Sequence, residues 1–159
     1  MPNYSTAAFS GSATFTPAAA SHTAGDVHGG AQQFTLLDRN GSPPAPGSHL
    51  RVVTASLMIN GATIETTAWT LYLYSATPGS AIADDAAIDL PSGDRASFLG
   101  TVAIAQVVDL GATLYIEGNP GKLMKLAADS SSVFGYLVNG TTLTPQAVAH
   151  VVTLHCEAV

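Results

Sequence analysis

The feature that most limits the fold of this chain is its succession of short apolar segments with strand periodicity, each closed by a turn signal. In segment 68–75, apolar side chains alternate with Thr and Tyr. The apolar set, Trp69, Leu71 and Leu73, is expected in the core, because alternate side chains of a strand point to opposite faces. No segment shows helical periodicity beyond a turn or two. The pattern predicts an all-β fold, an antiparallel β-sandwich.

Eight strands are expected in the larger, C-terminal part of the chain. They span residues 32–37, 49–60, 68–75, 98–108, 113–117, 122–127, 133–139 and 146–157. Turn sequences rich in Gly, Pro, Asn and Asp separate these segments. Asn60-Gly61 is the strongest hairpin signal among them.

The first 31 residues are predicted to form an extended N-terminal arm, and residues 32–159 a single β-sandwich domain. The arm consists mainly of Ala, Ser, Thr and Gly, yet it alternates like a strand over residues 6–17, with Phe9 and Phe15 on one face. So few bulky side chains add little to a core. We expect the arm to pair with its own sheet or with a neighbouring subunit, and to serve attachment more than folding.

The low charge of the chain indicates an assembly surface. Only 10% of the residues are charged, against about 25% in a typical protein, and a surface of Ser, Thr, Ala and Gly loses little hydration against a partner. The net charge of −6 and the five Lys and Arg residues leave no basic stripe for nucleic acid. We also expect no signal peptide and no membrane partner, because no apolar run approaches about 20 residues.

Aromatic side chains make up the candidate interface. Segment 133–138 is apolar on both faces, and strands of that kind are usually covered on both sides. The candidate interface residues are Phe9, Phe15, Tyr72, Tyr74, Phe134 and Tyr136. Together with the low charge they predict self-association, as a homotrimer.

No catalytic, cofactor or metal site is predicted, and we do not expect an enzyme. The sequence has no Gly-x-Ser-x-Gly elbow or other nucleophile motif. Cys156 is in phase with Val152 and Leu154, so we expect a buried structural thiol. The histidines have no ligand spacing and are expected to be scattered on the surface. They are His22, His28, His49, His150 and His155.

An acidic loop precedes residue 95, and it contains Asp84, Asp85, Asp89 and Asp94. Carboxylates in this number could ligate a hard cation such as Ca²⁺, although their spacing does not match an EF-hand loop. Alternatively, Asp84 or Asp85 caps a short helical turn over residues 84–90. We favour capping, and the sequence leaves the cation question open.

A sugar-binding module is the alternative to an assembly protein. Trp69, Tyr72 and Tyr74 offer aromatic faces on which a sugar could stack, and carbohydrate-binding modules are often β-sandwiches. The alternation places Trp69 in the core, so only the two tyrosines remain for such a site.

Several segments together resemble small virion structural proteins of tailed bacteriophages. They are the N-terminal run into Ala24-Gly25-Asp26-Val27, the strand end Leu71-Tyr72-Leu73-Tyr74-Ser75-Ala76-Thr77-Pro78, the loop Asp84-Asp85-Ala86-Ala87 with Asp94-Arg95-Ala96, and Thr144-Pro145-Gln146-Ala147. The resemblance implies a jelly roll, which periodicity alone does not distinguish from an immunoglobulin-like sandwich.

The same resemblance implies a head decoration or cement protein. Such a protein is made in the host cytoplasm, binds the capsid surface of the virion, and bridges and stabilises major capsid subunits, commonly as a trimer. Other proteins of the group sit in tails or portals. The alternative is therefore a carbohydrate- or receptor-binding module of a phage tail or fibre, and the resemblance implies no catalytic residue and no cofactor.

Overall fold

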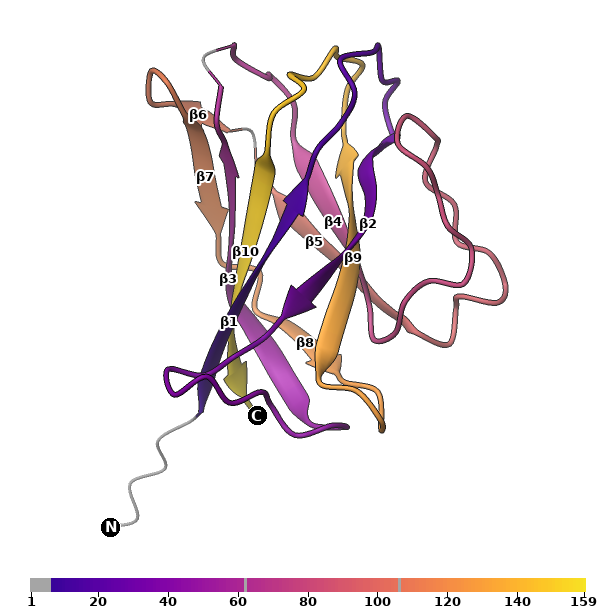
Figure 1. Ribbon diagram of the computed structural model, residues 1–159, viewed down its shortest axis with the longest axis vertical. Helices are drawn as coiled ribbons and strands as arrows, with labels where there is room; N and C mark the ends of the chain where they lie inside the picture. The colour runs from indigo at the N-terminus through magenta and orange to yellow at the C-terminus, as the bar shows by residue number, and fades with distance from the viewer. Residues whose placement is uncertain (1–6, 62, 106) are drawn as a thin grey trace.

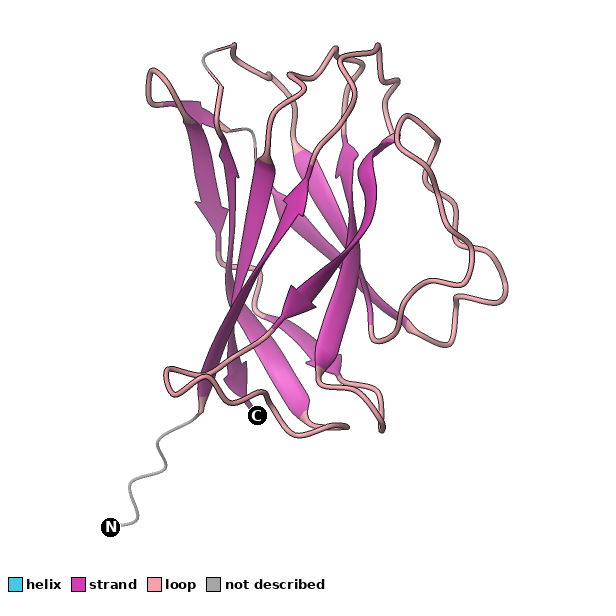
Figure 2. Ribbon diagram, in the orientation of Figure 1, coloured by secondary structure: helices cyan, strands magenta, loops and turns pink. Residues whose placement is uncertain are grey.

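Ten β-strands and no helix make up the part of the chain that the computed structural model describes, residues 7–61, 63–105 and 107–159 (Figure 1, Figure 2). The strands are β1 (Ala8–Phe15), β2 (Val27–Thr35), β3 (His49–Ile59), β4 (Trp69–Tyr74), β5 (Phe98–Ile104), β6 (Val108–Asp109), β7 (Leu114–Gly118), β8 (Lys122–Lys125), β9 (Ser132–Asn139) and β10 (His150–Ala158). Within these ranges there is no helix of the length and hydropathy needed to span a membrane. Each strand expected from the sequence has its counterpart, and the all-β prediction is confirmed.

The strands form two antiparallel sheets that pack face to face. One has the order β1-β10-β3-β7-β6, with β8 also paired to β3, and the other has the order β2-β9-β4-β5. From β1 to β4 the chain crosses between the sheets at every connection, and it crosses again from β5 to β6, from β8 to β9 and from β9 to β10. This double-sheet alternation is the topology of a jelly roll. The β-sandwich with jelly-roll topology is therefore confirmed.

The inner faces of both sheets share one core. The inward side chains of β3 are Leu50, Val52, Ala55, Leu57 and Ile59. Their phase changes after Val52 because the pairing of β3 with β10 contains a bulge. Trp69, Leu71 and Leu73 are completely buried in this core, as predicted. Burying an aliphatic side chain of this size contributes about 1.5–3 kcal/mol.

Residues 8–15 of the predicted N-terminal arm pair with a sheet of their own chain, which is one of the two alternatives expected for the arm. Residues 1–6 of the predicted arm lie outside the described residues. β1 pairs with β10 along its whole length, from Ala8 opposite Glu157 to Phe15 opposite His150. Phe15 is completely buried and Phe9 is 9% exposed. The predicted alternation of β1 is confirmed. Because β1 pairs with β10, its apolar face lies over the core, and its two phenylalanines and small side chains contribute to that core.

Two local predictions are also wrong. Asn60-Gly61 forms no β-hairpin, because β3 and β4 lie in different sheets and the connection crosses the end of the sandwich (Figure 1). Residues 84–90 form no helical turn. Asp85 instead has a left-handed backbone with φ of 62°, and Ala87 pairs with Asp26 in an isolated bridge. Contacts with this distant segment outweigh the weak local preference for a helix.

Candidate functional site

The loop between β4 and β5, residues 76–97, covers the outer face of the four-stranded sheet (Figure 1). Ile82, Ile88 and Leu90 of this loop pack on an outer apolar cluster made by Val27, Tyr74, Tyr136 and Val138. The hydroxyl of Tyr136 accepts a hydrogen bond from the Ile82 amide (3.2 Å) and donates one to the Ser80 carbonyl (3.1 Å). Both apolar faces of β9 are therefore covered by the chain itself.

This cover removes most of the predicted interface from the surface. Tyr74 and Tyr136 are buried under the loop, while Phe9 and Phe15 are buried in the main core. The prediction that these four side chains form an interface is wrong, because their own chain covers them. The remaining two, Tyr72 and Phe134, are half-buried against the outer cluster.

The same burial weakens two further expectations. The two-sided apolar character of β9 gives no reason to expect a homotrimer, since a loop of the same chain covers it. Trp69 and Tyr74 are 0% and 1% exposed, so neither offers a face to a sugar.

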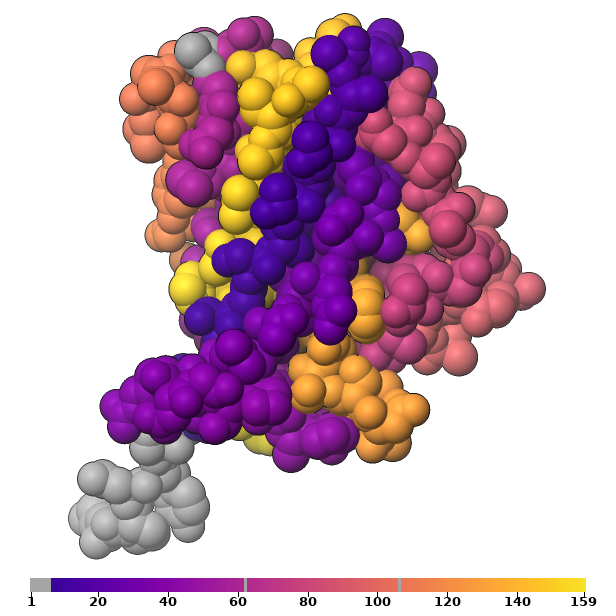
Figure 3. All heavy atoms as spheres, in the orientation of Figure 1, coloured from indigo at the N-terminus to yellow at the C-terminus, as the bar shows by residue number. Residues whose placement is uncertain are grey.

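The outer face of the six-stranded sheet has no comparable cover within the described residues, and we call it the open face. It is formed by the outward side chains of β1, β10, β3 and β7. They are Ser10, Ser12, Thr14, Val151, Thr153, His155, Val53, Thr54, Ser56, Met58, Tyr115 and Glu117. In Figure 3, β1 (indigo) and β10 (yellow) lie side by side at the surface, away from the loop 76–97.

The centre of the open face is uncharged. Ser12, Thr153 and Ser56 lie opposite one another on three adjacent strands, and the hydroxyl oxygens of Ser12 and Thr153 are 2.8 Å apart. Val53 and Met58 on β3 are 39% and 38% exposed. Hydroxyl and apolar side chains thus alternate over a sheet surface that faces solvent.

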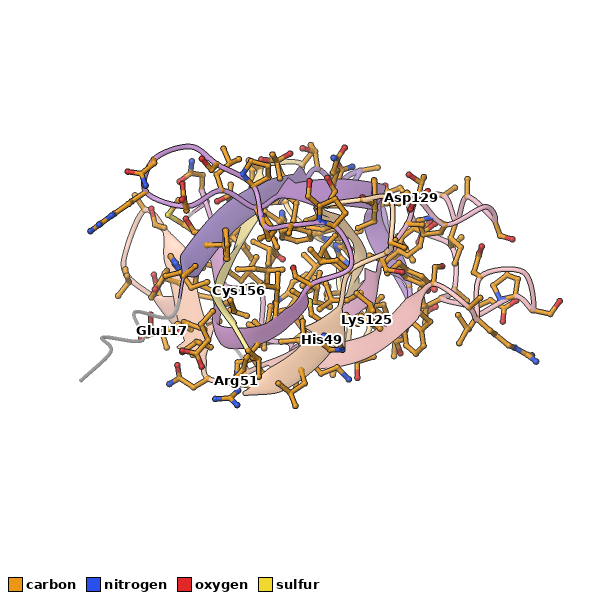
Figure 4. The ribbon with its side chains drawn as sticks, turned by 90° about the horizontal axis from the view of Figure 1, so that it is seen from below. His49, Arg51, Glu117, Lys125, Asp129 and Cys156 are labelled. Carbon is orange, nitrogen blue, oxygen red and sulfur yellow. The ribbon has the colours of Figure 1, made fainter. Side chains whose placement is uncertain are left out.

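Charged side chains lie at the margins of the open face. Arg51 and Glu157 form an ion pair of 3.1 Å near the lower end of the sheet, and Figure 4 shows Arg51 at the rim of the sandwich seen from that end. Glu117 of β7 lies further along, opposite Ser56. A groove of about 420 Å³ opens at this end, between β1, β10 and the turn after β2. Its lining includes Phe9, Leu37, Arg39, Val53 and His155. A groove of this size accommodates a side chain of a partner.

Three histidines expected on the surface are instead fully buried in one cluster. His22 precedes β2, His28 belongs to β2 and His150 begins β10. The ring centroid of His28 is 4.4 Å from that of His22 and 6.0 Å from that of His150. Trp69 packs edge-on against His28 at 4.7 Å. The surface prediction is wrong for these three, and it is right for His49 and His155.

The two outer rings of the cluster each lie between a carbonyl and a carboxylate. Nδ1 of His22 and of His150 donates to the carbonyl two residues earlier, at 3.1 and 3.0 Å. Nε2 of His22 is 3.2 Å from Asp84, and Nε2 of His150 is 2.9 Å from Glu65. Each ring nitrogen of these two histidines therefore faces an oxygen that can accept a hydrogen bond. Against the effect of burial, the hydrogen bond from His150 lowers the pKa of the Glu65 carboxyl.

His28, in the middle, has no hydrogen-bond partner at either ring nitrogen among the described residues. Burial, reinforced by the charges of His22 and His150, lowers its pKa from 6.5 to about 4. The ring is therefore neutral at neutral pH. Sequence reasoning missed the cluster because its members come from distant segments. The one available signal was His150, which shares the inward phase of Val152 and Leu154.

The carboxylates of the acidic loop bind backbone amides. Asp84 accepts from the amides of Ala18 (2.8 Å) and Gly29 (2.7 Å), and Asp94 accepts from two amides of its own loop at 2.8 and 3.2 Å. Against the effect of burial, the amides of Gly29 and Ala18 lower the pKa of Asp84. In the part of the chain that the structure describes, no group of three or more His, Cys, Asp or Glu side chains is arranged to hold a metal ion. Asp84 thus accepts hydrogen bonds from amides, as a capping residue does, but these amides belong to distant segments and not to a helix.

Cys156 faces the interior of the sandwich (Figure 4) and is 2% exposed. Burial raises the pKa of its thiol to about 12. The prediction of a buried structural thiol is confirmed.

Comparisons with known proteins assign no family. No protein-family profile and no curated protein matches the chain. Among solved structures, it is similar to the cleaved adhesin domain of Lys-gingipain from Porphyromonas gingivalis, with 11% identity, a TM-score of 0.32, and coverage of 81% of this chain and 64% of that domain. A lipoprotein from Bacteroides thetaiotaomicron aligns with 7% identity and a TM-score of 0.36 over 96% of this chain and 83% of its own. Murine APRIL aligns with 8% identity and a TM-score of 0.31 over 94% and 99%. At these scores the three structures transfer no activity or role to this chain.

Proposed function

We propose that this chain is a capsid decoration protein of a tailed bacteriophage, which binds the major capsid protein at the outer surface of the shell. The contrast between the two sheet faces carries the proposal: the loop 76–97 covers one, and the open face is bare and mostly uncharged. The resemblance of segments 71–78, 84–87 and 94–96 to virion structural proteins supports this class of protein. The jelly-roll topology agrees with it.

The chemistry of the open face suits docking on another protein. Its Ser and Thr hydroxyls cost less to desolvate than charged groups would, and the exposed Val53 and Met58 gain from being covered by a second surface. The groove beside Phe9 and Val53 offers a place for one side chain of a capsid subunit. Neutral contacts of this kind also depend little on salt concentration.

Bridging explains how modest contacts would stabilise a shell. A protein that touches two capsid subunits makes its second contact at high effective concentration, so neither contact has to be strong. A homotrimer would increase the number of contacts again. We retain the homotrimer in the proposal on the resemblance alone.

The test is cosedimentation of the purified chain with capsids of the parent phage assembled without it. Thr153→Glu places a charge in the centre of the open face, and we expect it to weaken capsid binding by about tenfold or more, because that charge would be desolvated. Thr101→Glu is the matched control. Thr101 lies opposite Tyr72 at an exposed position of β5 in the other sheet, and its variant should bind like the parent.

The outcomes separate the parts of the proposal. Equal binding by both variants and the parent would contradict docking through the open face. A parent chain that fails to bind the capsids would contradict the decoration function itself. Binding to a glycan array without binding to capsids would favour the tail or fibre module.

A further inference from the structure

The buried histidine cluster attaches the loop 76–97 to the rest of the molecule through one carboxylate. Asp84 of the loop accepts from the amides of Ala18 and Gly29 at 2.8 and 2.7 Å and lies 3.2 Å from Nε2 of His22. Ala18 and His22 belong to the connection from β1 to β2, and Gly29 belongs to β2 itself. One side chain of the loop therefore contacts both the connection that runs into β2 and β2 itself, which is an edge strand of the sheet that the loop covers.

Few other polar contacts hold the loop. Within the described residues, three backbone hydrogen bonds of 2.9 to 3.0 Å join it to residues 25–27, and the hydroxyl of Tyr136 adds two more bonds. In contrast, β10 is paired on both sides, with β1 and with β3. Segments with few bonds open at lower free energy than paired strands. The loop is thus the element that can detach before the sheets separate.

The titratable groups around His28 come from several packed segments. His22 comes from the connection before β2, Glu65 from the connection before β4, and His150 from β10. The loop contributes Asp84 and Asp85, which lie 3.2 and 3.8 Å from the ring nitrogens of His22. Asp26 is near in sequence, but its carboxylate binds Thr23. Trp69 is an uncharged neighbour of His28, and its Nε1 atom also has no partner in the described part of the chain.

On balance, acid destabilises this cluster. Burial and the charges of His22 and His150 disfavour a proton on His28, and they outweigh the attraction of Glu65 and Asp84 for that proton. A proton on Asp84 removes the negative charge that holds His22 and two amides. The pKa of His28 is about 4 in the closed cluster and 6.5 when the ring is in water. Opening therefore takes up a proton and becomes easier as the pH falls through this range, by up to about a hundredfold.

We propose that His22, His28 and Asp84 form a proton-operated latch: acidification releases the loop 76–97 from the outer face of the four-stranded sheet while the two sheets stay paired. Release exposes the outer apolar cluster of Val27, Tyr74, Tyr136 and Val138. A surface that is covered at neutral pH thereby becomes available in acid. The latch does not depend on the capsid proposal.

Hydrogen exchange of the full chain, read by mass spectrometry at about pH 7 and about pH 4, tests the latch directly. Rates are first corrected for the intrinsic pH dependence of amide exchange. We expect the protection of segment 76–97 and of residues 18–29 to fall by about ten- to a hundredfold at the lower pH. β3 and β10 should lose less protection than the loop. An equal loss in the loop and in these strands would overturn the proposal, because it would indicate global unfolding.

Two variants separate the latch from a general effect of acid. Asp84→Asn removes the carboxylate charge, so its loop should already exchange faster at neutral pH. Asp89→Asn is the matched control, because Asp89 lies in the same loop and its carboxylate binds only the next amide in the described structure, that of Leu90. His28→Phe keeps an aromatic ring in the cluster without a titrating group, and its loop should respond less to acid. A pH response equal to that of the parent in His28→Phe would overturn the latch.

Trp69 provides a second readout that does not require any variant to fold. It is the only tryptophan of the chain and packs against both His28 (4.7 Å) and His150 (5.5 Å). Its fluorescence should change between about pH 6 and pH 4, with the same midpoint as the exchange of the loop. Fluorescence that stays constant over this range would contradict protonation within the cluster.

Discussion

Replacing Tyr136 with phenylalanine tests how the outer face of the four-stranded sheet is covered. The side chain is completely buried, and its hydroxyl binds the Ile82 amide at 3.2 Å and the Ser80 carbonyl at 3.1 Å. Tyr136→Phe keeps the ring in the outer apolar cluster and removes both hydrogen bonds. The substitution therefore isolates the polar attachment of the loop from its apolar packing.

The expected cost follows from those two bonds. A buried hydrogen bond contributes about 0.5–1.5 kcal/mol net, so the loss of two predicts a decrease of about 1–3 kcal/mol in the free energy of unfolding. Ser80 and Ile82 are only half-buried, so water can replace part of the loss, and we expect about 1–2 kcal/mol. Tyr72→Phe is the matched control, since the described structure shows no hydrogen bond for its hydroxyl, and it should change stability by less than about 0.5 kcal/mol.

Urea denaturation measures both variants. With a slope of about 2 kcal/mol per molar urea, Tyr136→Phe should lower the midpoint by roughly 0.5–1 M at an unchanged slope. Equal midpoints for the two variants would refute the attachment of the loop through the Tyr136 hydroxyl. A lower slope for Tyr136→Phe alone would show instead that the loop is already open in its folded state.

Three further predictions follow from burial and charge. Phe15→Ala should lower the free energy of unfolding by about 3–5 kcal/mol, as measured by urea denaturation, because the side chain is 0% exposed. A loss below about 1 kcal/mol would instead support the expectation that residues 1–31 serve attachment more than folding. The free energy of unfolding should also fall as the pH is lowered from 6.5 to 4, because the unfolded chain takes up a proton at His28 that the closed cluster, with a pKa of about 4, does not; the fall should be smaller than the loss of loop protection, because the folded chain with its loop released can bind the same proton. Urea titrations at several pH values measure this change. The free energy of unfolding should depend less on pH in His28→Phe than in the parent. Cys156 should react with Ellman's reagent only after urea unfolds the chain, since burial raises its pKa to about 12.

The sequence alone determined the local features of this fold. Alternation identified the strands and assigned the inward face of β4 to Trp69, Leu71 and Leu73, because the two-residue period of a strand is a local property. The same period assigned Phe9 and Phe15 to one face of β1. The resemblance to virion proteins selected the jelly roll over the immunoglobulin-like sandwich, a choice that periodicity could not make.

Only the tertiary structure decided which surfaces meet. The sequence shows that β9 is apolar on both faces, but it does not show whether a second subunit or the loop 76–97 covers it. A strong Asn60-Gly61 turn signal was likewise overridden, because β3 pairs with β10, β7 and β8 while β4 joins the other sheet. Pairing between distant strands depends on the whole arrangement of the core, which no short window of sequence contains.

The histidine cluster illustrates this limit most clearly. His22, His28 and His150 lie up to 128 positions apart (150 − 22), and each alone resembles an ordinary polar residue near a strand end. The crossings of the jelly roll bring the start of β2, the start of β10 and the loop 76–97 to one end of the sandwich. Their burial, their carboxylate partners and the lowered pKa of His28 are consequences of that convergence, because the desolvation of a ring depends on the atoms packed around it rather than on its neighbours in the chain.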